Sequence, residues 1–107
     1  MLLLLLAMLA VPQVKAPTLT NRTEIIKERE RLSRLLIAPH DTVTVWVFVD
    51  INPKGHATRI ESPQDDVKPN IKQAALDLVA KMRWKAGTQN GKPVKIINKI
   101  PVKFARP

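Results

Sequence analysis

The sequence predicts a two-layer α+β domain with a three-stranded antiparallel sheet, a main helix between the second and third strands, and an extra N-terminal helix. Apolar residues recur twice at helical spacing, three other segments alternate between apolar and polar residues, and turn residues separate these segments. The order along the chain is helix, strand, strand, helix, strand. With 107 residues, of which 45% are hydrophobic, the chain has room for one core.

Residues 1–16 stand apart from this pattern. Their apolar run, at residues 2–11, is well short of the roughly 20 residues that span a bilayer. We expect an export signal that is removed from the mature chain. A membrane anchor truncated at its start and a mis-assigned start codon are the alternatives, and all three interpretations take this segment out of the folded core.

Residues 17–41 are expected to form a short linker and an amphipathic helix that Pro39 ends. Asn21 and Glu24 have the spacing of a capping box, and isoleucine and leucine then recur at near-helical intervals. Acidic and basic residues alternate among them, which is typical of a solvated helix face.

The first two strands are predicted around an Asn-Pro-Lys-Gly turn at residues 52–55. In the first strand four valines share one face, and Trp46 and Phe48 occupy the other; the second strand covers residues 56–62. We expect the N-terminal helix or a second copy of the chain to cover the two aromatic side chains, and a partner site is the alternative.

The main helix is expected to begin near Asn70, which has Gln73 three residues later as a second capping pair. Its core-facing positions share helical spacing: Ile71, Ala74, Ala75, Leu78, Val79 and Met82. After it, Trp84 is either an exposed stacking platform or a core plug, and we favour the plug because a buried indole removes on the order of 200 Å² from water.

The next residues predict how the chain leaves the helix and enters the last strand. Gly87 allows the helix to stop, Asn90 and Gly91 allow the positive φ angles of a tight turn, and Pro93 stiffens the entry to the strand. In that strand Val94, Ile96, Ile100, Val102 and Phe104 face inward, and Lys95, Lys99 and Lys103 face outward. Pro101 cannot donate a ladder hydrogen bond, so the strand is expected at a sheet edge, or with a bulge at this residue.

Residues 43–104 resemble the TonB C-terminal domain family of periplasmic energy transducers. The resemblance rests on a valine-rich strand that ends in Asp and a Gly turn, a helix with paired alanines, an aromatic and basic helix exit, an Asn-Gly-x-Pro-Val turn and a last strand with Pro-Val before Phe. The matching residues are Val49, Asp50, Gly55, Ala74, Ala75, Trp84, Asn90, Gly91, Pro93, Val94, Pro101, Val102 and Phe104.

The resemblance implies a binding module at residues 42–107 that holds a segment of an outer-membrane receptor by β-strand addition. The expected contact residues lie on the last strand: Lys95, Ile96, Ile97, Asn98 and Lys99. It also implies a periplasmic location, reached by export or by an anchor in the inner membrane, and envelope partners that include the receptor and inner-membrane proton-channel proteins. A homodimer is a further expectation.

Catalysis has little support in the sequence, and we expect neither an enzyme nor a bound cofactor or metal. The chain has no cysteine, and His40 and His56 are not in a metal-ligand spacing. The formal net charge of +9 leaves one alternative function, a basic nucleic-acid-binding module that uses Trp46, Phe48 and the lysines of the last strand. The export-like N-terminus argues against that alternative.

Overall fold

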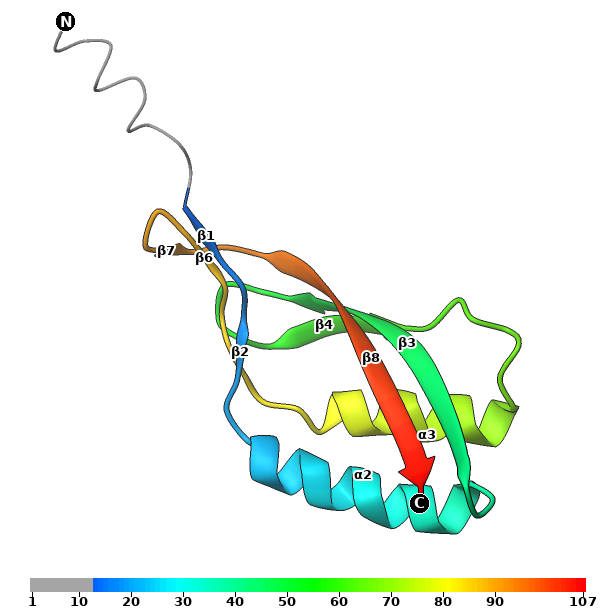
Figure 1. Cartoon of the computed structure of the whole chain (residues 1–107). Coiled ribbons are helices and arrows are strands. Elements are labelled where there is room, and N and C mark those ends of the chain that lie inside the picture. The colour runs from blue at the N-terminus through cyan, green and yellow to red at the C-terminus, as the bar shows by residue number, and fades with distance from the viewer. Residues whose placement is uncertain (1–12) are drawn as a thin grey trace, which may run out of the picture.

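The computed structural model describes residues 13–107, which form two layers (Figure 1). One layer is an antiparallel sheet in the order β4 (Ala57–Glu61), β3 (Asp41–Ile51) and β8 (Ile96–Arg106). The other layer consists of α2 (Arg22–Leu36) and α3 (Pro69–Ala80), which lie on the same side of the sheet. The predicted α+β class is confirmed. The predicted export signal begins in residues 1–12, which lie outside the described residues.

The core lies between β3 and the two helices, because β3 turns its valines to that side. Val45, Val47 and Val49 are fully buried, and successive residues of a strand point to opposite faces. Both helices, the residue that follows α2 (Ile37) and β8 contribute to the same cluster: Ile25, Ile37, Ile71, Ala75, Leu78, Val79, Val102 and Phe104. The predicted inward face of the first strand is therefore confirmed, and α2 is packed into the core of the domain.

Trp46 and Phe48 lie on the other face of β3, where the helices do not reach. The side chain of Trp46 remains 41% exposed, and Phe48 is half-buried. The expectation that the N-terminal helix covers these residues is wrong, because α2 places Ile25 and Ile37 on the valine side of the sheet. That side offers a continuous apolar surface, which gives the amphipathic helix more area to bury.

The capping box predicted for α2 does not form, because Asn21 makes other contacts. Its side chain makes no capping hydrogen bond to the helix backbone. Instead, Nδ2 of Asn21 donates to the carbonyl oxygen of Lys81 (2.9 Å), and Oδ1 accepts from the backbone N–H of Arg83 (2.9 Å). Asn21 therefore ties the start of α2 to the end of α3.

The second capping prediction, for Asn70 and Gln73, is also wrong. α3 begins earlier, with Lys68 at the N-cap and Pro69 as the first helical residue. Proline suits that place because its ring presets φ and its missing N–H would have no partner there. Asn70 consequently lies inside the first turn of α3, one residue after its start.

Residues 13–20 run antiparallel to residues 83–90, and we call this paired segment the N-terminal ribbon. It contains β1 (Val14–Lys15) paired with β6 (Thr88–Gln89), and β2 (Thr18–Leu19) paired with β5 (Trp84–Lys85). At its two ends the backbone N–H of Asn90 donates to the carbonyl oxygen of Gln13 (2.8 Å), and the backbone N–H of Thr20 donates to the carbonyl oxygen of Arg83 (2.8 Å). In Figure 1 the ribbon extends away from the helices.

Gly87 lies within this ribbon and does not end a helix, because α3 already ends at Ala80. The prediction for Gly87 is therefore wrong. A Cβ atom at this position would overlap Cδ1 of Ile96 and lie 2.9 Å from the carbonyl oxygen of Lys15. Glycine is needed here because β1 and β8 both approach its α-carbon closely.

A two-residue turn joins β6 to β7 (Lys92–Pro93), with Asn90 and Gly91 at its centre. Their φ angles are 52° and 81°, which is the positive range predicted for this turn and required by a tight hairpin of type I′. Pro93 pairs with Thr88 and precedes Val94, whose N–H donates to Gly87. The hairpin therefore delivers the chain to the start of β8.

Trp84 lies at the margin of the core. It is half-buried and packs against the buried cluster, opposite Leu19 in the β2–β5 pair. Its position supports the core plug rather than the exposed platform, although the burial is less complete than predicted. Its Nε1 atom is buried without a hydrogen-bond partner among the described residues. A Cβ on Gly55 would lie 2.5 Å from the carbonyl oxygen of Trp84, so the β3–β4 turn also approaches this residue closely.

Candidate partner-binding edge

The candidate site is the outer edge of β8, which pairs with β3 and, within residues 13–107, with no other strand. One hydrogen bond fixes which backbone groups face outward: Trp46 donates its N–H to Oε1 of Gln64 (3.0 Å), on the β4 side of β3. In an antiparallel pair, successive residues alternate between pointing both backbone groups at the partner strand and away from it. Odd-numbered residues of β3 therefore bond to even-numbered residues of β8, as for Val45 and Val102.

The odd-numbered residues of β8 consequently turn their backbone groups to the open edge. Ile97, Lys99, Lys103 and Ala105 each offer one N–H donor and one C=O acceptor there, and Pro101 offers only its C=O. Pro101 thus removes no hydrogen bond from the sheet, which agrees with its prediction as an edge-strand residue.

The predicted binding residues 95–99 divide into two sets at this edge. Ile97 and Lys99 present their backbone groups outward, whereas the even-numbered residues bond toward β3. Lys95 precedes β8, and its Nζ lies 3.7 Å from Oδ2 of Asp50. The open edge also continues beyond the predicted range to Ala105.

The outer face of the sheet, opposite the helices, continues this edge as an apolar surface with a cation in it. Ile97 is 64% exposed, and Pro101 lies opposite Trp46 in the β3–β8 pair. The ammonium group of Lys99 lies 4.7 Å from the ring centre of Trp46 and 5.7 Å from that of Phe48. Both are cation–π distances, so the ammonium group of Lys99 contacts both rings beside the open edge.

On the helix side of the edge, a groove of about 640 Å³ separates α2 from the end of β8. We call it the α2–β8 groove. It is lined by Arg29, Glu30, Ser33, Arg34, Lys103, Ala105, Arg106 and Pro107. Four of these side chains are basic and one is acidic, so the groove carries a net positive charge.

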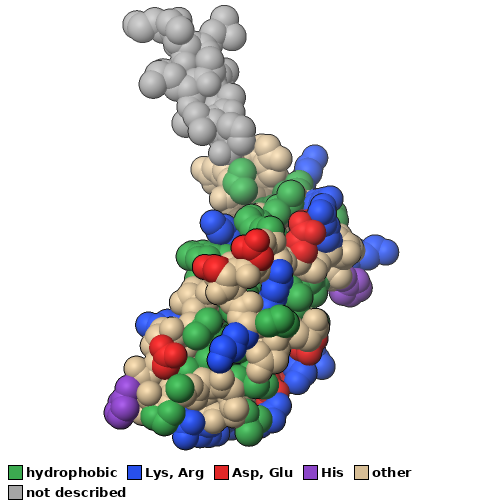
Figure 2. Space-filling view, turned by 90° about the vertical axis from the view of Figure 1, so that its right-hand side faces the viewer, with side chains coloured by type: hydrophobic (Ala, Val, Ile, Leu, Met, Phe, Trp, Pro, Cys, Tyr) green, Lys and Arg blue, Asp and Glu red, His purple; other side chains and the backbone are tan. Residues whose placement is uncertain are grey.

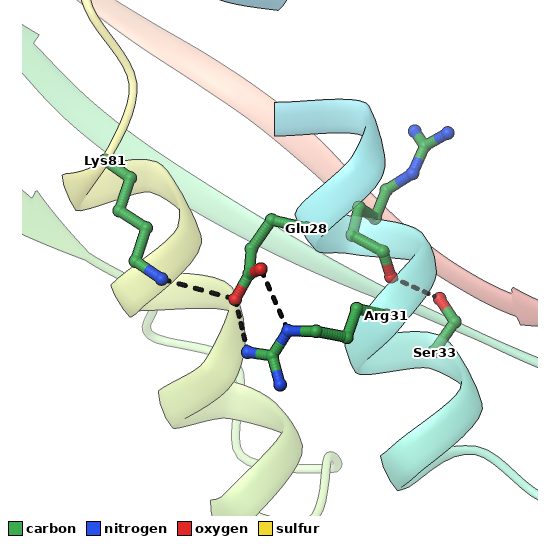
Figure 3. A network of polar contacts seen from close by, with 5 residues as sticks. Glu28, Arg31, Ser33 and Lys81 are labelled. Carbon is green, nitrogen blue, oxygen red and sulfur yellow. Dashed lines mark hydrogen bonds and ion pairs between the residues drawn. The ribbon is translucent and has the colours of Figure 1, made fainter. Parts of the chain in front are cut away.

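A polar network across α2 and α3 holds the helix that forms one wall of this groove (Figure 3). Arg31 donates to both carboxylate oxygens of Glu28 (3.0 and 2.5 Å), and Nζ of Lys81 lies 3.2 Å from the same carboxylate. The hydrogen bond from Arg31, and secondarily that from Lys81, lowers the pKa of Glu28 to about 2. On the same helix, Ser33 donates its hydroxyl hydrogen to the carbonyl oxygen of Arg29 (2.8 Å).

The sequence identified Lys103 as an outward-facing residue but did not identify the arginines of the groove. Arg29 and Arg34 sit among acidic residues in the linear sequence, which predicted only a solvated helix face. On the face shown in Figure 2, Lys and Arg side chains are scattered among acidic and hydrophobic ones and form no single basic patch. The grouping of Arg29 and Arg34 with Lys103 and Arg106 arises only when β8 lies against α2.

Within residues 13–107, no group of three or more His, Cys, Asp or Glu side chains is arranged to hold a metal ion. Over the same residues, neither helix is long and apolar enough to cross a membrane.

Comparison with known proteins identifies the family. The family model described as "Gram-negative bacterial TonB protein C-terminal" matches residues 41–105, from the start of β3 almost to the end of β8. Searches of curated proteins and of solved structures found no significant match. Domains of this family are periplasmic and non-enzymatic, serve energy transduction, and interact with envelope proteins such as outer-membrane receptors. Since the match covers more than half of the 107 residues, the chain belongs to the TonB C-terminal family, as its sequence predicted.

Proposed function

We propose that this chain holds an extended segment of an outer-membrane receptor by adding that segment as a fourth strand beside β8, in support of energy-dependent transport. The observation that carries the proposal is the row of open backbone groups on β8 between Ile97 and Ala105. Strand addition needs such a row, because main-chain hydrogen bonds provide most of the affinity in this mode of recognition.

The energetics favour a weak and reversible contact. Each main-chain hydrogen bond contributes about 0.5 to 1.5 kcal/mol net, whereas ordering each residue of an extended segment costs about 1 to 2 kcal/mol. These two terms nearly cancel, so the contact stays weak unless side chains on both sides of the edge add to the main-chain hydrogen bonds. The apolar outer face around Ile97 and Trp46 supplies one such contact surface.

The lysines of the edge favour a foreign segment over a second β8 strand. Lys99 and Lys103 are exposed on β8, and like charges would meet if two copies of this edge paired. Charged residues on an exposed edge are a common means of preventing self-association. A receptor segment without matching lysines would not meet this repulsion.

The test replaces Ile97 with proline and measures binding of an extended peptide from a candidate outer-membrane receptor by calorimetric titration. Ile97→Pro deletes one outward N–H and obstructs the added strand, yet β8 already accommodates Pro101 at an equivalent outward position. We expect the fold to survive, as judged by circular dichroism, and binding to weaken at least tenfold, or about 1.4 kcal/mol.

Two control variants separate the backbone from the side chain and from the fold. Ile97→Val keeps the N–H and should bind like the parent. Asn98→Pro removes an N–H that faces β3, which loses one ladder hydrogen bond and leaves a carbonyl oxygen of β3 unpaired, so it should destabilise the fold by about 2 to 4 kcal/mol. A folded Ile97→Pro variant that binds as tightly as the parent would rule out strand addition at this edge.

A further inference from the structure

The α2–β8 groove runs along the open edge itself. The strand residues that line it include Lys103 and Ala105, which are the odd-numbered residues whose backbone groups face outward. The inward-facing residues of the same stretch, Val102 and Phe104, are buried in the core and do not line the groove. A segment that pairs with this end of β8 would therefore lie over the groove, with α2 below it.

The geometry of a strand then determines what enters the groove. Side chains of an added strand alternate between the outer face of the sheet and the helix side, and those on one side are about 7 Å apart. One or two helix-side chains of the segment would consequently reach between β8 and α2.

The charges in the groove determine which side chains suit it. Arg29, Arg34 and Lys103 make no ion pair with any residue that the structure describes. Arg106 donates through Nη1 to the carbonyl oxygen of Ile37 (3.2 Å). Arginine offers planar pairs of N–H donors that match the two oxygens of a carboxylate. Glu30 is the single acidic residue of the lining, so the excess of positive charge stays unmatched within the groove.

We propose that the α2–β8 groove binds carboxylate side chains of the added segment, so that the partner carries Asp or Glu at the positions that face α2. This inference rests on the proposed strand addition, and it specifies the chemistry of the segment. Outer-face positions of the same segment would be apolar where they adjoin Ile97, Pro101 and Trp46, although Lys99 and Lys103 also lie on that face. The expected partner therefore alternates acidic and apolar residues along about five to seven positions, the usual length of a strand.

The test uses two synthetic nine-residue peptides that carry valine at alternate positions and either glutamate or glutamine at the others. The two peptides differ in charge and hardly in shape. At low salt we expect the glutamate peptide to bind the full chain about three to ten times more tightly, which is the range that one or two partly exposed ion pairs provide. This preference should shrink as the salt concentration rises.

Variants of the protein show where the glutamate side chains of the peptide bind. The double variant Arg29→Gln/Arg34→Gln should abolish the preference for glutamate, and Glu30→Gln should increase it by removing a like charge. Lys54→Gln is the matched control, because it removes one positive charge in the β3–β4 turn, at the opposite end of β3 from the groove. It should leave the preference unchanged.

The outcomes separate this inference from the proposed function. If both peptides bind equally and Ile97→Pro weakens both, strand addition stands and the groove has no carboxylate preference. If the preference survives in Arg29→Gln/Arg34→Gln but disappears in Lys99→Gln, the carboxylates lie on the outer face and the inference is wrong. If the arginines control binding and Ile97→Pro has no effect, the groove holds carboxylates and strand addition is wrong. Failure of both synthetic peptides to bind, while a receptor peptide binds and is weakened by Ile97→Pro, would overturn this inference alone.

Discussion

Replacing Gly87 with alanine tests how tightly the N-terminal ribbon is packed against β8. The added methyl group would overlap Cδ1 of Ile96 and lie 2.9 Å from the carbonyl oxygen of Lys15, which belongs to the backbone of β1. Forcing one extra carbon into a filled site costs about 1 to 3 kcal/mol. The smaller entropy of the unfolded alanine chain offsets about 0.4 to 1 kcal/mol of this. We therefore expect a net loss of about 1 to 2 kcal/mol in the free energy of unfolding.

The assay is urea unfolding followed by circular dichroism, with Gly91→Ala and a double variant as controls. Gly91 has a φ of 81° and no atom within 4 Å of an added Cβ, so its substitution costs conformational energy without a clash. Adding Ile96→Val removes the overlapping Cδ1 and should recover at least about 0.5 kcal/mol for Gly87→Ala but nothing for Gly91→Ala. Strict additivity in the first pair, or an unchanged midpoint for Gly87→Ala, would refute the close approach.

Three further predictions concern the helix layer and the core margin. Because the pKa of Glu28 is lowered from 4.5 to about 2, its ionised form stabilises the fold above about pH 4.5. This contribution is lost as the pH falls toward 2. The free energy of unfolding of Glu28→Gln should therefore fall less than that of the parent over this pH range, and the same pH dependence in both proteins would contradict the network. Trp84→Phe removes a buried N–H without a partner but also part of an indole that packs against the core, so it should cost clearly less than the roughly 3 to 5 kcal/mol of Trp84→Ala; an equal loss for the two variants would contradict this reasoning. Asn21→Ala leaves the Lys81 carbonyl and the Arg83 N–H without their side-chain partner and should cost about 1 to 2 kcal/mol in urea unfolding, and an unchanged midpoint would contradict these bonds. Asn21→Asp should not recover this loss, because its second oxygen would face the acceptor oxygens of Lys81 and Glu24.

The sheet and its core were predictable because burial leaves a pattern in neighbouring residues. The valines of β3 alternate with exposed positions, and each alternate residue points to one face, so the buried set of Val45, Val47 and Val49 follows from local sequence. Pro101 indicated an edge strand for a similarly local reason, since a residue without an N–H is tolerated only where no sheet bond is needed.

The N-terminal ribbon could not be predicted in this way. It joins Val14 to Gln89 and Leu19 to Trp84, and the two partner segments are short, far apart in the sequence and without apolar alternation. Its formation also explains the wrong prediction for Asn21. The side chain had the spacing of a helix cap, but two backbone groups at the end of α3 compete for it, and only the tertiary structure brings them within reach.

The candidate site was predicted only in part, because the rest of it depends on contacts between elements that are far apart in the sequence. The sequence located the edge strand, but it did not show which N–H groups point to the open edge, because their direction depends on strand pairing. The hydrogen bond from the Trp46 N–H to Gln64, together with the β3–β8 register, shows that direction. The α2–β8 groove was missed because its cations come from two elements. Charges on a helix have no assigned neighbour until the strand beside them is known.

The N-terminal ribbon also has a mechanical consequence. β1 and β2 lie antiparallel to β6 and β5, so a tension applied at Gln13 along the strand axis would load their cross-strand hydrogen bonds together, in shear. A tension applied across that axis would peel them one at a time, beginning at Asn90. The same domain would thus resist a pull strongly in one direction and yield in another, and the ribbon would take up the load before the valine core did.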